Sequence, residues 1–72
     1  MRELVRTNNP VLLSWFQALL NQEGIKTFVF DSHTSVLEGS ANAIPRRLMV
    51  IDDDYDKARE AITEAGEGKH LV

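Results

Sequence analysis

Cysteine is absent from this sequence of 72 residues, which excludes disulfide bonds and thiolate metal sites. A domain of this size buries only about 60% of the surface that its unfolded chain exposes, so its core is marginal. Small domains add stability through disulfides, bound metals or a partner subunit. With the first route closed, we expect association with another subunit to contribute here.

An excess of positive charge is also absent. The sequence has 8 Lys and Arg against 11 Asp and Glu, and its net charge is −3. This balance argues against nucleic acid or an anionic membrane as the main partner. No apolar run approaches the length of about 18 residues that a membrane span needs, and the opening residues lack the apolar core of a signal peptide. We therefore expect a cytoplasmic protein.

The acidic run at residues 52–56 lacks calcium-binding spacing. An EF-hand loop that began with this run would need glycine at its sixth position and glutamate at its twelfth, where this sequence has Lys57 and Thr63. We interpret the run as the start of a helix, in which Asp53 and Asp56 resemble a capping box. Magnesium bound together with a phosphate is the alternative. We predict no metal site and no cofactor.

A catalytic group is not identifiable in the sequence. Ser32, Ser35 and Ser40 lie near His33 and Asp31, but neighbours within one loop rarely reach the geometry of a catalytic triad. No nucleophile-elbow pattern surrounds any of these serines. We therefore expect that the protein is not an enzyme.

Turning to what is present, the periodicity predicts a β-α-β-β-α order with a possible final strand. The expected strands are Arg2–Thr7, Ile25–Phe30 and Leu48–Ile51, and the expected helices run from Pro10 to Gly24 and from Asp52 to Gly66. This order predicts an α+β fold of the ferredoxin-like βαββα(β) type, with two helices on one face of an antiparallel sheet. Residues 1–66 form one domain, and residues 67–72 form a tail or a short edge strand.

The first helix carries the clearest local signals. Asn9 is placed to cap its amide donors, Pro10 suits the first helical position, and Gly24 can end the helix in a left-handed conformation. An apolar stripe is expected along Leu12, Trp15, Phe16, Leu19 and Leu20. We interpret Trp15 as a core residue, with ligand stacking as the alternative. On the second helix a single face carries Tyr55, Ala58, Ile62 and Ala65.

Two expected strands are apolar on both faces. A sheet covered by helices on one side alternates polar and apolar residues when its other side meets water. Neither 28–30 nor 48–51 alternates in this way. We therefore expect the open face to be covered by the loop or by another subunit, and we predict a homo-oligomer, either a dimer or a trimer.

The connection at residues 31–47 is longer than a hairpin needs, and it ends in two arginines. Most connections in compact domains are about 4–6 residues long, and longer ones are often functional. Arginine presents a planar fork that suits carboxylate or phosphate. Adjacent residues of a strand point to opposite faces, so one of Arg46 and Arg47 would face the open side of the sheet.

These residues suggest a small anion-binding site. We hypothesise that His33, Ser40, Arg46 and Arg47 form it, with Glu38 and Gly39 supplying a tight turn of backbone amides and Pro45 a rigid entry to the strand. The alternative is that both arginines make structural salt bridges to Glu38 or to the acidic helix start.

The same segment resembles a known family. Residues 33–40 and 44–50 resemble the signature of small bacterial proteins labelled "putative signal transducing protein", a domain of unknown function, and residues 3–11 and 52–66 resemble its opening and closing elements. The resemblance covers about residues 2–66. It implies a βαββα(β) fold broadly similar to nitrogen-regulatory PII proteins and other ferredoxin-like regulators. It also implies a role in signalling, with no catalytic residues to carry over.

Two functions follow from the sequence. The first is a regulatory, non-enzymatic domain that binds an anionic small molecule, or an acidic patch on a partner, at residues 31–47. The alternative is a protein–protein adaptor that uses the apolar sheet face, with the loop purely structural.

Overall fold

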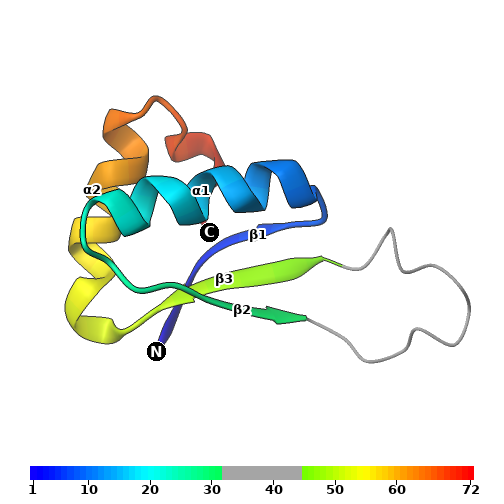
Figure 1. Cartoon of the computed structure of the whole chain (residues 1–72), viewed down its shortest axis with the longest axis horizontal. Helices are drawn as coiled ribbons and strands as arrows, with labels where there is room; N and C mark the ends of the chain where they lie inside the picture. Colours follow the sequence, from blue (N-terminus) through cyan, green and yellow to red (C-terminus); the bar gives the residue numbers. More distant parts are fainter. Residues whose placement is uncertain (32–44) are drawn as a thin grey trace, which may run out of the picture.

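In the computed structural model, residues 1–31 and 45–72 are described, and they form three strands, two α-helices and two short 3₁₀ turns (Figure 1). The elements in chain order are β1 (Arg2–Thr7), α1 (Pro10–Gln22), β2 (Phe28–Asp31), β3 (Arg46–Val50), η3 (Asp52–Asp54), α2 (Tyr55–Glu64) and η4 (Gly68–His70).

The strands form one antiparallel sheet in the order β1-β3-β2, so β3 is central and pairs with both other strands. Both helices lie on the same side of this sheet (Figure 1). The predicted α+β class is therefore confirmed, and the described sheet has three strands. Within the described ranges, no helix has the length and hydropathy that crossing a bilayer requires.

Helix α1 begins and ends where its sequence signals predict. The Asn9 side-chain oxygen accepts hydrogen bonds from the backbone N–H of Val11 at 3.0 Å and of Leu12 at 3.2 Å. Pro10 is the first helical residue, where its missing N–H costs nothing. Gly24 has a φ of +79°, which is the left-handed conformation that reverses the chain after a helix.

The core lies between the helices and the sheet. From α1 it receives Leu13, Phe16 and Leu20, which recur at helical spacing and are almost fully buried. The residues that complete the core are Leu4, Val5, Ile25, Leu48, Val50, Ala58 and Ile62.

Trp15 does not belong to this core, and the prediction that placed it there was wrong. Its exposed fraction is 45%, and its ring lies edge-on to that of the buried Phe16, with ring centroids 5.3 Å apart. Leu12, Trp15 and Leu19 form a row beside the buried row, and both rows have helical spacing. The sequence pattern could not tell which row faces the sheet.

Two strand boundaries differ from those expected. The Ile25 N–H donates to the carbonyl of Leu20 at 2.9 Å, so the end of α1 uses this donor and β2 begins later, at Phe28. Strand β3 begins at Arg46 and ends at Val50, and Ile51 is exposed as the residue that leads into η3.

The acidic run begins a 3₁₀ turn instead of an α-helix, and α2 starts at Tyr55. In this described part of the chain, no side-chain hydrogen bond caps η3 or α2, so the capping-box interpretation of Asp53 and Asp56 was wrong. The apolar face of α2 is confirmed at Ala58 and Ile62, which are buried. Ala65 at its end is exposed.

The C-terminal residues lie against the outer edge of β1. After η4, Leu71 forms an isolated antiparallel bridge with Val5, and the Val72 N–H donates to the carbonyl of Leu4 at 3.1 Å. The expected edge strand in the tail is thus reduced to one bridge.

Strand β1 contains a β-bulge that shifts the phase of its side chains. Glu3 pairs with Met49 and Val5 pairs with Leu48, which are consecutive residues of β3. Leu4 is therefore an extra residue in β1 that pairs with no residue of β3. Leu4 and Val5 are consecutive, yet both are fully buried. As a result, residues on either side of the bulge share a face even though they are an odd number of positions apart.

We predict that Asn9→Ala lowers the free energy of unfolding by about 1 kcal/mol, because two amide donors lose their acceptor. Chemical denaturation followed by circular dichroism measures this change. Asn21→Ala removes an exposed asparagine from the last turn of the same helix and serves as the control. Equal stability of the two variants would contradict the capping role.

Candidate functional site

The structure describes only part of the predicted anion site. Arg46, Arg47 and Pro45 lie at the start of β3, while His33 and Ser40 fall outside the described residues, as do Glu38 and Gly39. The four-residue site therefore stays a prediction, and the described geometry concerns its arginines.

The two arginines lie on opposite faces of β3. Leu48 and Val50 are buried under the helices, so Arg46 shares their side of the strand and Arg47 shares the other side with Met49. Arg46 is exposed at the end of the strand, whereas Arg47 is half-buried. The sequence rule that separates adjacent strand residues thus describes this pair correctly.

The sheet surface turned away from the helices, here called the open face, combines charge with apolar side chains. The register aligns its six residues in two rows across β1, β3 and β2: Glu3, Met49 and Phe28 in one row, and Arg6, Arg47 and Phe30 in the next. Phe30 has an exposed fraction of 42%. The prediction of apolar side chains on this face is confirmed for Phe28, Phe30 and Met49.

Glu3 and Arg6 form a two-point ion pair on the open face. The Arg6 Nε donates to Glu3 Oε2 at 2.7 Å, and its Nη2 donates to Oε1 at 2.9 Å. The bulge makes this possible, because residues three apart on a regular strand point to opposite faces. Sequence reasoning missed this pair, since nothing in the alternation of β1 marks an extra residue.

The ion pair shifts the acidity of Glu3. Its hydrogen bond from Arg6 lowers the pKa of the Glu3 carboxyl below the ordinary value of 4.5, partial burial opposes this, and the charges of Arg6 and Arg47 add to the lowering. The pKa of Glu3 is lower in the folded state than in the unfolded state. Ionised Glu3 therefore stabilises the fold at any pH above its unfolded-state pKa. That contribution is lost as the pH falls through the folded-state pKa.

Arg47 occupies the centre of the second row, and among the described residues no carboxylate pairs with it as Glu3 pairs with Arg6. Its cross-strand neighbours are Arg6 and Phe30. The carboxylate in the adjoining row, that of Glu3, is held by Arg6. The Arg47 Nε is buried and has no hydrogen-bond acceptor among the residues described. Leaving a buried donor unsatisfied costs about 1–3 kcal/mol, so a hydrogen-bond acceptor at this atom would stabilise the protein.

The acidic run lies away from the open-face residues, at the start of the second helix region. The Asp52 carboxylate lies 2.9 Å from the Met1 ammonium, whose hydrogen bond and charge lower the pKa of Asp52, with a further contribution from Arg2. In residues 1–31 and 45–72, no three His, Asp or Glu side chains gather in a way that could hold a metal ion.

The model of a family described as "Putative prokaryotic signal transducing protein" matches residues 1–66. The chain belongs to this family. The resemblance expected from the central segment is thereby confirmed, and residues 67–72 lie beyond the match.

The description of this signal transducing family indicates a role in signal transduction, and it specifies no particular function. No curated protein matches the chain. Any ligand or partner must therefore be inferred from the residues themselves.

We predict that Arg6→Gln returns the pKa of Glu3 toward 4.5, because it removes the hydrogen bond that contributes most to the lowering. NMR titration of the Glu3 side-chain carboxyl measures this change. Lys26→Gln removes an exposed cation outside the open face and should leave the Glu3 titration unchanged. If Arg6→Gln titrates like the unmodified chain, the ion pair does not control Glu3.

Proposed function

We propose that this chain is a non-enzymatic regulatory domain of prokaryotic signalling, which acts in the cytoplasm by binding an anionic group at Arg47 on the open face. The observation that carries the proposal is the buried Arg47 Nε, which has no acceptor among the described residues. The family description supports the signalling role.

Charge favours an anion at this position. Arg6 and Arg47 are cross-strand neighbours, and the described part of the open face offers them one carboxylate, Glu3, which Arg6 holds at two points. The cluster therefore keeps a positive excess. The planar guanidinium of Arg47 can donate two parallel hydrogen bonds to a carboxylate or a phosphate, which are stronger than neutral hydrogen bonds.

Apolar neighbours suggest the rest of the ligand. Phe30 lies beside Arg47 on β2, and Phe28 and Met49 lie in the adjoining row. A ligand that joined an anionic group to an apolar or aromatic body would engage both parts of the surface. Binding sites commonly combine apolar walls with a few polar groups that fix orientation.

Binding without catalysis is supported by the same residues. General acid–base chemistry needs a positioned group free to exchange a proton. The carboxylate on the open face is engaged in an ion pair that lowers its pKa, so it is a poor base beside Arg47.

The arrangement of the chain supports the inference of a ferredoxin-like fold, as in PII-like regulators. In the βαββαβ order the last strand lies beside the first, antiparallel to it, and the bridge from Leu71 to Val5 occupies that position. The order β1-β3-β2 agrees with the remaining three strands.

A second candidate function is self-association through the open face, favoured by the exposure of Phe30 and the apolar neighbours Phe28 and Met49. The face carries both signs of charge, so a second copy related by a two-fold axis could place Glu3 of one chain near Arg47 of the other. A two-fold interface requires a self-complementary patch of this kind.

We predict that Arg47→Ala weakens anion binding by about tenfold or more, the cost of losing a charged hydrogen bond. The measurement is a titration with nucleotides and with small aromatic carboxylates, followed by backbone amide shifts. Shifts should centre on 28–30 and 46–49. Arg46→Ala is the matched control, because it removes the same side chain from the other face of the strand.

Equal losses in the two variants would show that general positive charge, and not the open face, attracts the anion. An absence of localised shifts with every compound would remove the small-molecule form of the proposal.

We predict that the chain sediments as a dimer or trimer at micromolar concentration and that Phe30→Asp reduces the mass toward that of a monomer, because it introduces charge into the apolar patch. Val11→Asp is the control, since Val11 is 77% exposed on α1 and lies off the sheet. A monomer under all conditions would remove self-association as a function of this face.

A further inference from the structure

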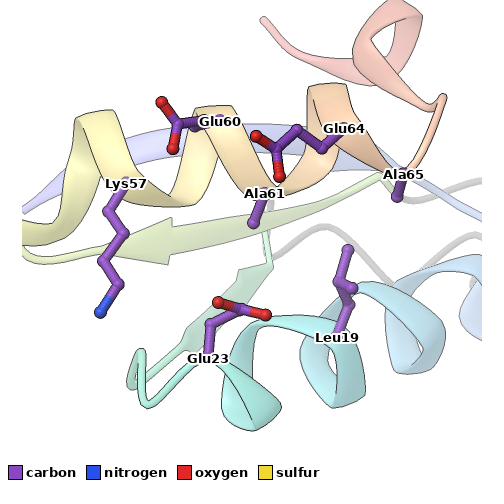
Figure 2. Close-up of a pocket in the computed structure, with 7 residues that line it drawn as sticks. All are labelled: Leu19, Glu23, Lys57, Glu60, Ala61, Glu64 and Ala65. Carbon is purple, nitrogen blue, oxygen red and sulfur yellow. The ribbon is translucent and has the colours of Figure 1, made fainter.

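A groove runs between the two helices, in the layer on the other side of the sheet from the open face. One hollow of about 280 Å³ lies between α1 and α2, and a second of about 340 Å³ lies along α1. Leu19 lines both of them. The residues of the first hollow are Leu19, Glu23, Lys57, Glu60, Ala61, Glu64 and Ala65 (Figure 2). The second is lined by Trp15, Ala18, Leu19 and Gln22.

The floor of this helix groove is apolar and shallow. Ala61 of α2, Ala65 just after the end of α2 and Leu19 of α1 point toward one another across the gap (Figure 2). Ala61 and Leu19 pack partly against the core, which fixes their positions. The two alanines are four residues apart, on one side of the helix, and their small side chains let another backbone approach closely.

The rim of the helix groove is acidic. Glu23, Glu60 and Glu64 line it with a single cation, Lys57. The ion pairs recorded for the described residues use none of these three carboxylates. Glu60 and Glu64 are like charges at i and i+4, an arrangement that destabilises a helix. This repulsion costs the helix about 0.2–0.5 kcal/mol, which a basic partner would offset.

Trp15 continues the surface along α1. It is the only tryptophan in the sequence, and 45% of it is exposed. Exposed tryptophans beside apolar hollows are typical of residues that dominate binding energy at protein interfaces. This observation is independent of the carboxylates and indicates an apolar contact in the same groove.

We propose that the helix groove, from Trp15 to Ala65, binds an amphipathic helix of a protein partner whose apolar ridge is flanked by lysines or arginines. A groove between two helices accepts a third helix through anchors at i, i+3 or i+4, and i+7. Residues 15–23 span about 12 Å along α1, which corresponds to roughly two turns of such a helix. Apolar anchors contact Trp15, Leu19 and the alanines, and the flanking cations meet the three glutamates.

The test uses a synthetic helical peptide of about 16 residues, long enough to form a helix, with leucines at the anchor positions and lysines elsewhere. A scrambled peptide of the same composition is the control for charge alone. The measurements are the fluorescence of Trp15 and the backbone amide shifts of the full chain. We expect saturable binding of the patterned peptide, with shifts along 15–23 and 57–65, and at least tenfold weaker binding of the scrambled peptide.

Paired variants separate the groove from net charge. Glu60→Gln with Glu64→Gln should weaken peptide binding about tenfold, from the loss of two charge pairs, while the thermal midpoint stays equal or rises because the like-charge pair is gone. Asp53→Asn with Asp56→Asn changes the net charge equally, at exposed positions outside the groove, and should leave binding within about twofold. Ala65→Leu fills the first hollow and should also weaken binding.

Three outcomes would overturn the proposal. Equal binding of the patterned and scrambled peptides means attraction by charge alone. Shifts that centre on the open face place the contact on the other side of the sheet. Concentration-dependent shifts in α1 and α2 without any peptide mean that a second copy of this chain occupies the groove.

Discussion

The central position of β3 is the constraint on which this structure depends. Both other strands pair with β3 and neither pairs with the other, so the described sheet exists only through its five residues. Leu48 and Val50 bury one side of the strand beneath the helices, while Arg47 and Met49 form the middle of the open face. One short segment therefore contributes to both the hydrophobic core and the candidate site. A shift of its register by one residue would turn the core side chains to the open face and the open-face side chains to the core.

The two faces of the molecule offer opposite electrostatics. In the described residues, the open face carries Arg6 and Arg47 against one carboxylate, whereas the helix groove has three glutamates against one lysine. The chain as a whole is acidic, with a net charge of −3, so the positive excess on the open face depends on local arrangement. A domain with surfaces of opposite sign can distinguish two partners by charge, because like charges suppress the wrong encounter.

Features that depend on neighbouring residues could be predicted from the sequence, while features that depend on tertiary packing could not. Asn9, Pro10 and Gly24 act through their own backbone and nearest amides, and all three behave as expected. The separation of Arg46 from Arg47 follows from strand alternation alone. By contrast, the bulge at Leu4 depends on pairing with a strand more than forty residues away, and the exposure of Trp15 depends on which of two equivalent rows meets the sheet. The place of Arg6 beside Arg47 and Glu3 could therefore not be predicted from the sequence.

The bridge from Leu71 to Val5 has a consequence for the growth of the sheet. It occupies the outer edge of β1, and in the described part of the chain no strand lies beside β2 on its outer side. The bridge at Val5 and the hydrogen bond at Leu4 leave fewer unpaired backbone groups on the edge of β1 for a strand of another chain. The short C-terminal segment thus protects part of the outer edge of β1 against pairing with another strand, with a single bridge and one further hydrogen bond.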